Sequence, residues 1–142
     1  NLSEEQRKKL KKKLSESLKG KTGGLRRGGG RGKSGWYKQF WCDSSWELAY
    51  VIYCIEHGIE IIRNTVGFEY LFEEKIFKYY PDFLLKDGTY IEIKGYMTKK
   101  NEAKINQFPY RLTILDKKAI EKYIDYVELK YGKNFVKLYG AV

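Results

Sequence analysis

Three polar side chains in the second half of the sequence have the chemistry needed to bind a divalent cation and act on water. Asp82 follows a proline, and Glu92 and Lys94 form a Glu-x-Lys pair ten residues later. Carboxylates bind Mg²⁺, and Mn²⁺ can take its place. The ion neutralises phosphate charge and makes a nucleophile from water, while a nearby ammonium orients the water and offsets charge in the transition state. These three residues are therefore catalytic candidates for metal-assisted hydrolysis of a phosphodiester.

We expect two strands, residues 83–85 and 89–94, to form the hairpin that positions these side chains. A two-residue loop would turn Asp82 and Glu92 to opposite faces, because successive strand residues alternate. A three-residue loop, residues 86–88, would place them directly opposite each other on one face. The candidate site therefore requires the longer loop, with its glycine in the left-handed conformation beside a β-bulge.

Alternation along the same strands supports this arrangement. Lys94 would join the carboxylates, whereas Phe83, Ile91 and Ile93 would point into the core. The opposing interpretation is an ordinary half-exposed strand, in which Glu-x-Lys occurs by chance. The Pro-Asp dipeptide and the loop glycine favour the functional interpretation.

Glu47 is a further candidate, because it is an acidic residue on a helix that is otherwise apolar. The run from Ser44 to His57 predicts this helix, with Ser44 as N-cap and Gly58 as terminator. A buried carboxylate is costly unless it is paired or binds a metal, which favours a place for Glu47 in the site. In the alternative, Ser44 and Glu47 form a capping box, and the carboxylate returns to the Ser44 amide.

The remaining elements predict a mixed β-sheet flanked by helices, in the α/β (α+β) class. We expect further strands at residues 59–63, 68–72, 76–80, 111–115 and 135–139, a helix at 98–107, and a helix between the cap Asp116 and Gly132. The folded domain is expected to begin between Gly35 and Phe40. The chain therefore divides into a basic arm, residues 1–35, and a domain, residues 36–142.

Basic charge is concentrated at the start of the chain. Residues 1–40 contain 13 Lys and Arg against 3 Asp and Glu, and the other residues contain 15 of each, so residues 1–40 carry the whole net charge of +10. We expect a helix over residues 3–18 and then a glycine-rich stretch, residues 20–35. Such an arm fits nucleic acid, although a solvated tail is the alternative. The candidate DNA-binding residues are Lys11, Lys12, Lys13, Lys19, Lys21, Arg26, Arg27, Arg31 and Lys33.

Composition argues against several other classes of protein. Cys42 and Cys54 are the only cysteines, and no Cys/His cluster accompanies them, so we expect neither a disulfide framework nor a zinc site. No apolar run reaches the ~18 residues of a membrane span, and no signal-peptide core is visible. We expect no membrane partner and a place in the cytoplasm of a bacterial or phage-infected cell.

The segments SSWELAYVIYCIEHGI, YYPDFLLKDGTYIEIKGY and RLTILD resemble the PD-(D/E)xK nuclease superfamily over about residues 40 to 116. Their order looks most like phage Holliday-junction-resolving endonucleases and transposase-type nuclease domains. The resemblance implies a restriction-endonuclease-like core and a Mg²⁺-dependent endonuclease. It also implies a metal site of Asp82, Glu92, the Ile93 carbonyl and the helix acid Glu47, with Lys94 as the catalytic lysine.

The arm segment LSEEQRKKLKKKLSESLKGKTGG is similar to a short nuclease-associated modular DNA-binding motif, found in phage and intron homing endonucleases, over about residues 2–24. Together the two resemblances imply a homing-type phage endonuclease that acts on double-stranded DNA. Two alternatives stay open: a nuclease selective for branched or mismatched DNA, and a DNA-binding protein with an inactive nuclease fold. The sequence also leaves a monomer and a homodimer open.

Overall fold

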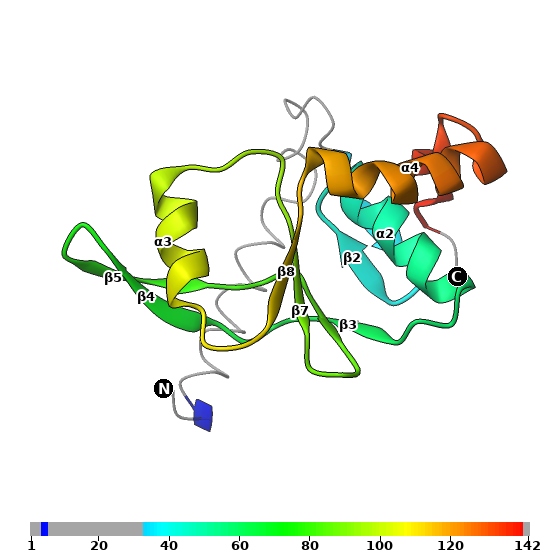
Figure 1. The fold of residues 1–142 in the computed structure, drawn as a ribbon. Coiled ribbons are helices and arrows are strands. Elements are labelled where there is room, and N and C mark those ends of the chain that lie inside the picture. Colours follow the sequence, from blue (N-terminus) through cyan, green and yellow to red (C-terminus); the bar gives the residue numbers. More distant parts are fainter. Residues whose placement is uncertain (1–3, 6–32, 141–142) are drawn as a thin grey trace.

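The computed structural model describes residues 4–5 and 33–140, which are drawn in colour in Figure 1. Of the helix expected at residues 3–18, Glu4 and Glu5 are described, and both are helical. The DNA-binding candidates from Lys11 to Arg31 lie outside the described residues. Lys33 is exposed, and its backbone carbonyl accepts a hydrogen bond of 2.7 Å from the Tyr139 hydroxyl.

A four-stranded mixed sheet runs through the centre of the domain, in the order β3-β6-β7-β8 (Figure 1). Its strands are β3 (Ile61–Arg63), β6 (Phe83–Leu85), β7 (Tyr90–Ile93) and β8 (Leu112–Leu115). β6 pairs antiparallel with both β3 and β7, whereas β7 and β8 are parallel. The parallel pair needs a crossover, which α3 (Lys99–Gln107) supplies. The expected mixed sheet with flanking helices is confirmed.

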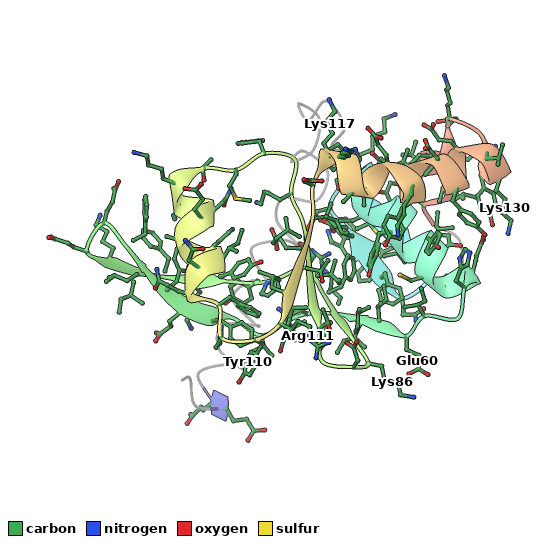
Figure 2. The ribbon with its side chains drawn as sticks, in the orientation of Figure 1. Glu60, Lys86, Tyr110, Arg111, Lys117 and Lys130 are labelled. Carbon is green, nitrogen blue, oxygen red and sulfur yellow. The ribbon has the colours of Figure 1, made fainter. Side chains whose placement is uncertain are left out.

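Two helices lie side by side over one face of this sheet (Figure 1). The first is α2 (Ser45–Glu56), and the second is α4 (Lys117–Tyr131), whose ends are marked by Lys117 and Lys130 in Figure 2. Each begins at an expected cap, because Ser44 accepts from the Glu47 amide at 3.3 Å and Asp116 accepts from the Ala119 amide at 2.8 Å. None of the helices in the described part of the chain combines the length and apolar character that crossing a membrane requires.

The core lies between the helices and the sheet, and it explains the arrangement of the layers. Leu48, Val51 and Ile52 of α2 and Phe83 of β6 are fully buried, with Ile91 of β7 beside them. Each such side chain contributes about 1.5–3 kcal/mol by leaving water. Cys42 and Cys54 are buried and unpaired, as expected. The apolar residues of α2 therefore meet the face of the hairpin strands that was predicted to point into the core.

A second hairpin projects from the central sheet and carries α3 (Figure 1). It consists of β4 (Phe68–Phe72) and β5 (Lys75–Tyr79), and its turn residues Glu73 and Glu74 have φ of 50° and 66°. The side chain of Gln107 attaches α3 to β4 by two hydrogen bonds of 2.8 Å to the backbone of Leu71. The α3 helix is therefore fixed against the hairpin at a defined position.

Two segments near the ends of the domain differ from the expectation. A short hairpin of β1 (Gly35–Tyr37) and β2 (Phe40–Cys42) precedes α2 and was not predicted. The strand predicted at residues 135–139 is wrong, because Phe135–Leu138 form a 3₁₀ turn. In a strand Lys137 would share a face with the buried Phe135, whereas a helical spacing of three turns Phe135 and Leu138 inward together.

Candidate active site

The β6–β7 hairpin has the register that the candidate site requires. Phe83 pairs with Ile91, and the loop glycine, Gly88, has φ of 92°. The same register places Asp82 directly opposite Glu92. The predicted three-residue loop is therefore confirmed, and the core-facing positions are those expected from alternation.

Asp82 lies where the chain leaves the ladder between β6 and β7. Its Oδ2 accepts a hydrogen bond of 2.8 Å from the Ile93 amide, in the place that a main-chain carbonyl would take in a continued antiparallel pair. Asn64, which is 8% exposed and directly follows β3, binds the backbone of Pro81 and Asp82 from the side opposite β7. Its amide donates to the Asp82 carbonyl at 3.0 Å, and its Nδ2 donates to the Pro81 carbonyl at 2.9 Å. Both neighbouring strands thus fix the backbone and the carboxylate of Asp82.

Glu92 is buried beside Lys94. It is 5% exposed, and its Oε2 lies 3.6 Å from the Lys94 Nζ. The Tyr79 hydroxyl donates to the other oxygen, Oε1, at 2.9 Å. Burial raises the pKa of the Glu92 carboxyl, while the Lys94 ammonium and the Tyr79 hydroxyl act in the opposite direction. The structure thus brings the two residues of the Glu-x-Lys pair together and adds a tyrosine.

Arg63 links the start of α2 to the carboxylates of the sheet. Its guanidinium lies 2.6 Å from Glu47 Oε1, 2.8 Å from Asp43 Oδ2 and 3.9 Å from Asp82 Oδ1. Glu47 Oε1 also accepts from the Asp43 amide at 3.1 Å. Ser44 therefore caps the helix, but the Glu47 carboxylate does not return to the Ser44 amide as a capping box would require. Glu47 lies instead in the same charged cluster as Asp82.

The carboxylates of this cluster hinder one another from ionising. Burial raises the pKa of the Asp82 carboxyl to about 7, and the Glu92 carboxylate adds to the rise. Burial also raises the pKa of the Glu47 carboxyl to about 7, with Asp82 as the next cause. Arg63 opposes both shifts but does not remove them. The cluster is therefore short of positive charge, which a divalent cation would supply.

Asp82 and Glu92 fit a Mg²⁺ ion that keeps part of its water shell. Among residues 4–5 and 33–140, no three His, Cys, Asp or Glu side chains are grouped closely enough to hold a metal. Mg²⁺ does not need three, because it keeps several waters and binds one or two carboxylates. The Ile93 carbonyl points from the same strand edge as the Ile93 amide, which is the edge that faces Asp82. Glu47 is held by Arg63 and would have to release it to bind the ion.

Arg63, Asn64 and Tyr79 complete the site and were not among the residues expected from the sequence. Arg63 could have been predicted from the sequence. Alternation along β3 places it on the same side as the buried Ile61, where a cation needs carboxylate partners. Asn64 and Tyr79 could not be predicted in this way, because their partners Pro81 and Glu92 lie on other segments of the chain.

No family model, curated protein or solved structure matches this chain. The function is therefore inferred from the residues of the site itself.

Proposed function

We propose that this protein is a Mg²⁺-dependent endodeoxyribonuclease of the PD-(D/E)xK type, which hydrolyses phosphodiester bonds in DNA. The observation that carries the proposal is the position of Asp82 directly opposite Glu92, whose carboxylate lies 3.6 Å from the Lys94 ammonium. Two carboxylates and one ammonium are the groups that metal-assisted hydrolysis of a phosphodiester needs.

The residues of the site have distinct tasks in this proposal. A Mg²⁺ ion bound by Asp82, Glu92 and the Ile93 carbonyl would supply Lewis acidity and lower the pKa of its water. The Lys94 ammonium would orient that water and offset negative charge on the phosphorane-like transition state. Tyr79 holds one oxygen of Glu92, which leaves the other for the ion or for Lys94. The hydrogen bond from Ile93 fixes the direction of Asp82.

The order of the elements supports a restriction-endonuclease-like core. The helix that carries Glu47 precedes the sheet, and three antiparallel strands follow, with Asp82 directly before β6 and Glu92 on β7. A crossover through α3 then leads to the parallel strand β8. This arrangement agrees with the core that the sequence resemblance implies. The basic arm, which includes Lys33, supports double-stranded DNA as the substrate and a homing-type activity.

Cleavage of supercoiled plasmid and of linear duplex tests the proposal. We expect the full chain to cut both in Mg²⁺ or Mn²⁺, and Asp82→Asn or Lys94→Ala to lower the rate by about 10²-fold or more. A folded wild-type protein that leaves both substrates intact with either ion would remove the nuclease assignment and favour an inactive DNA-binding protein. Preferential cutting of a four-way junction over the linear duplex would instead identify a structure-selective nuclease.

A further inference from the structure

Two lysines of α3 lie over aromatic rings of β5. The Lys100 Nζ is 3.6 Å from the centre of the Phe77 ring, and the Lys104 Nζ is 4.7 Å from the centre of the Tyr79 ring. Two residues along a strand span ~6.6 Å, and four residues along a helix span ~6 Å. Because the two spacings match, the ammonium groups form a row along the hairpin.

This row leads into the candidate active site. Tyr79, which lies under Lys104, is the residue whose hydroxyl binds Glu92 at 2.9 Å. Burial lowers the pKa of Lys104, and the Lys94 ammonium lowers it further, while Glu92 and Asp82 act in the opposite direction. Lys104 is thus within electrostatic reach of both candidate metal ligands and of Lys94. The three ammonium groups follow the order Lys100, Lys104, Lys94 toward the carboxylates.

The start of α3 is defined by a cap, and its C-terminal end is fixed against the hairpin. The Thr98 side chain caps the helix by accepting from the Asn101 amide at 3.1 Å. At the other end, Gln107 is bound to the Leu71 backbone, and the Phe108 ring lies 5.6 Å from the Tyr79 ring. A rotation of α3 that moved Lys104 away from the site would break the contacts of Gln107 and Phe108 with the hairpin.

Pairing with protein carboxylates does not explain the two lysines. Within residues 33–140, neither Lys100 nor Lys104 forms an ion pair at salt-bridge distance. An ammonium on the face of a ring keeps N–H donors that point away from it, and these can bind an anion. Unpaired cations beside a site for phosphodiester hydrolysis are suited to the phosphates of the substrate strand.

We propose that Lys104 and Lys100 bind successive backbone phosphates of the DNA strand that enters the active site, with Lys104 on the phosphate next to the one that is cut. The inference deepens the proposed nuclease function and rests on it. It adds a phosphate-binding row on α3 to the candidate residues of the N-terminal arm.

The test compares the full-length wild type with Lys104→Gln, Lys100→Gln and Lys104→Arg. The matched control is Lys122→Gln, because Lys122 lies 4.9 Å from the Tyr123 ring on α4, in a similar contact away from the carboxylates. Binding to a linear duplex is measured without divalent cation over a range of salt concentrations. Cleavage is measured at saturating DNA in Mg²⁺, and thermal unfolding checks that each variant is folded.

We expect each of the variants Lys104→Gln and Lys100→Gln to reduce the slope of log Kd against log salt by about 1. Lys104→Gln should also lower the cleavage rate at saturating DNA by about tenfold or more, since a charge-assisted hydrogen bond next to the reacting phosphate is lost. Lys104→Arg should restore most of the slope and the rate. Lys122→Gln should behave as the wild type in every measurement.

Slopes and rates of Lys104→Gln and Lys100→Gln equal to those of Lys122→Gln would overturn the inference, even if the wild type cuts DNA. If the wild type does not cut DNA, the proposed function fails, and the binding slopes decide on the phosphate row alone. In that case reduced slopes would support the row, and unchanged slopes would refute it.

Discussion

The carboxylate of Asp82 and the backbone amide of Ile93 are joined by a hydrogen bond of 2.8 Å. This bond ties the candidate metal ligand on one strand to the strand that carries the other ligand, Glu92. The direction of Asp82 is therefore set by β7 itself, and a side chain at residue 82 has a structural task in addition to its proposed catalytic one.

Substituting Asp82 by two different residues separates those tasks. Asp82→Asn keeps an oxygen that can accept from Ile93 and removes a buried charge that Glu92 repels, so we expect stability equal to or above that of the wild type. Asp82→Ala leaves the amide without its partner, which costs about 1–3 kcal/mol. Both variants should lose cleavage. Urea unfolding curves check the order of stability, and an Asn variant less stable than the Ala variant would contradict it.

Arg63 should be among the most important residues for stability in the site. Removing its guanidinium takes the Arg63 cation away from the buried carboxylates of Glu47 and Asp82, so Arg63→Gln should lower the free energy of unfolding by about 3 kcal/mol. Adding Glu47→Gln should recover part of the loss, since one buried carboxylate is then removed.

The matched control for Arg63 is a pair on the surface. Lys86 and Glu60 lie 3.6 Å apart near the loop of the β6–β7 hairpin, and both side chains are exposed (Figure 2). Lys86→Gln should therefore change the free energy of unfolding by less than about 1 kcal/mol. Equal effects of Arg63→Gln and Lys86→Gln on the free energy of unfolding in chemical denaturation would show that Arg63 does not stabilise the buried carboxylates.

The hydroxyl and the ring of Tyr79 have separate partners. The hydroxyl binds Glu92, and the ring lies under Lys104. Tyr79→Phe removes the 2.9 Å hydrogen bond but keeps the ring, so we expect a fall in stability of about 1.5 kcal/mol and a single-turnover cleavage rate about tenfold lower. Tyr126→Phe is the control, because it removes a 2.6 Å bond to Glu56, away from the candidate site. That variant should lose stability and keep its rate; a similar rate loss in both would argue against a role for Tyr79 in the site.

Glu56 should make the stability of the domain depend on pH. Burial acts to raise its pKa, but hydrogen bonds from Lys130, Tyr126 and Tyr131 outweigh burial and lower the pKa below the ordinary 4.5. A lowered pKa means that the unfolded chain binds the proton first, so the stability contributed by Glu56 is present above pH 4.5 and is lost as pH falls through the folded pKa. The difference in unfolding free energy between wild type and Glu56→Gln should therefore shrink in acid. A difference that stays constant from neutral to acidic pH would contradict this.

The length of β6 should be critical for activity. Deleting Leu84 shortens the strand by one residue, and a shift of one residue turns every side chain of a strand to the other face. We expect this deletion to abolish cleavage and to destabilise the domain, because Asp82 would move to the position opposite Ile91 and away from Glu92. Leu84→Ala keeps the strand length and should retain cleavage in the same plasmid assay. Activity in the deletion variant would mean that the two carboxylates need not share a face.

Local patterns in the sequence predicted much of the fold. The helices α2 and α4 begin at the expected caps, and β4 and β6 have the expected bounds. For the hairpin register, local rules left two loop lengths open, and the requirement that Asp82 and Glu92 share a face selected the three-residue loop that the structure has. The contacts of Asn64 and Tyr79 join segments that are distant in the sequence, and no periodicity indicates them. The β1–β2 hairpin was missed because its aromatic residues lie in strands of three residues each, which are too short to show a period.

The side chain of Gln107 also covers part of an open strand edge of the β4–β5 hairpin. Its amide occupies both the N–H and the C=O of Leu71, which face away from β5, at 2.8 Å each. An open strand edge of this kind, next to the exposed apolar side chains of Leu71 and Ile76, is a template for pairing with another chain. One glutamine thus blocks a ladder that a second copy of the hairpin could otherwise extend.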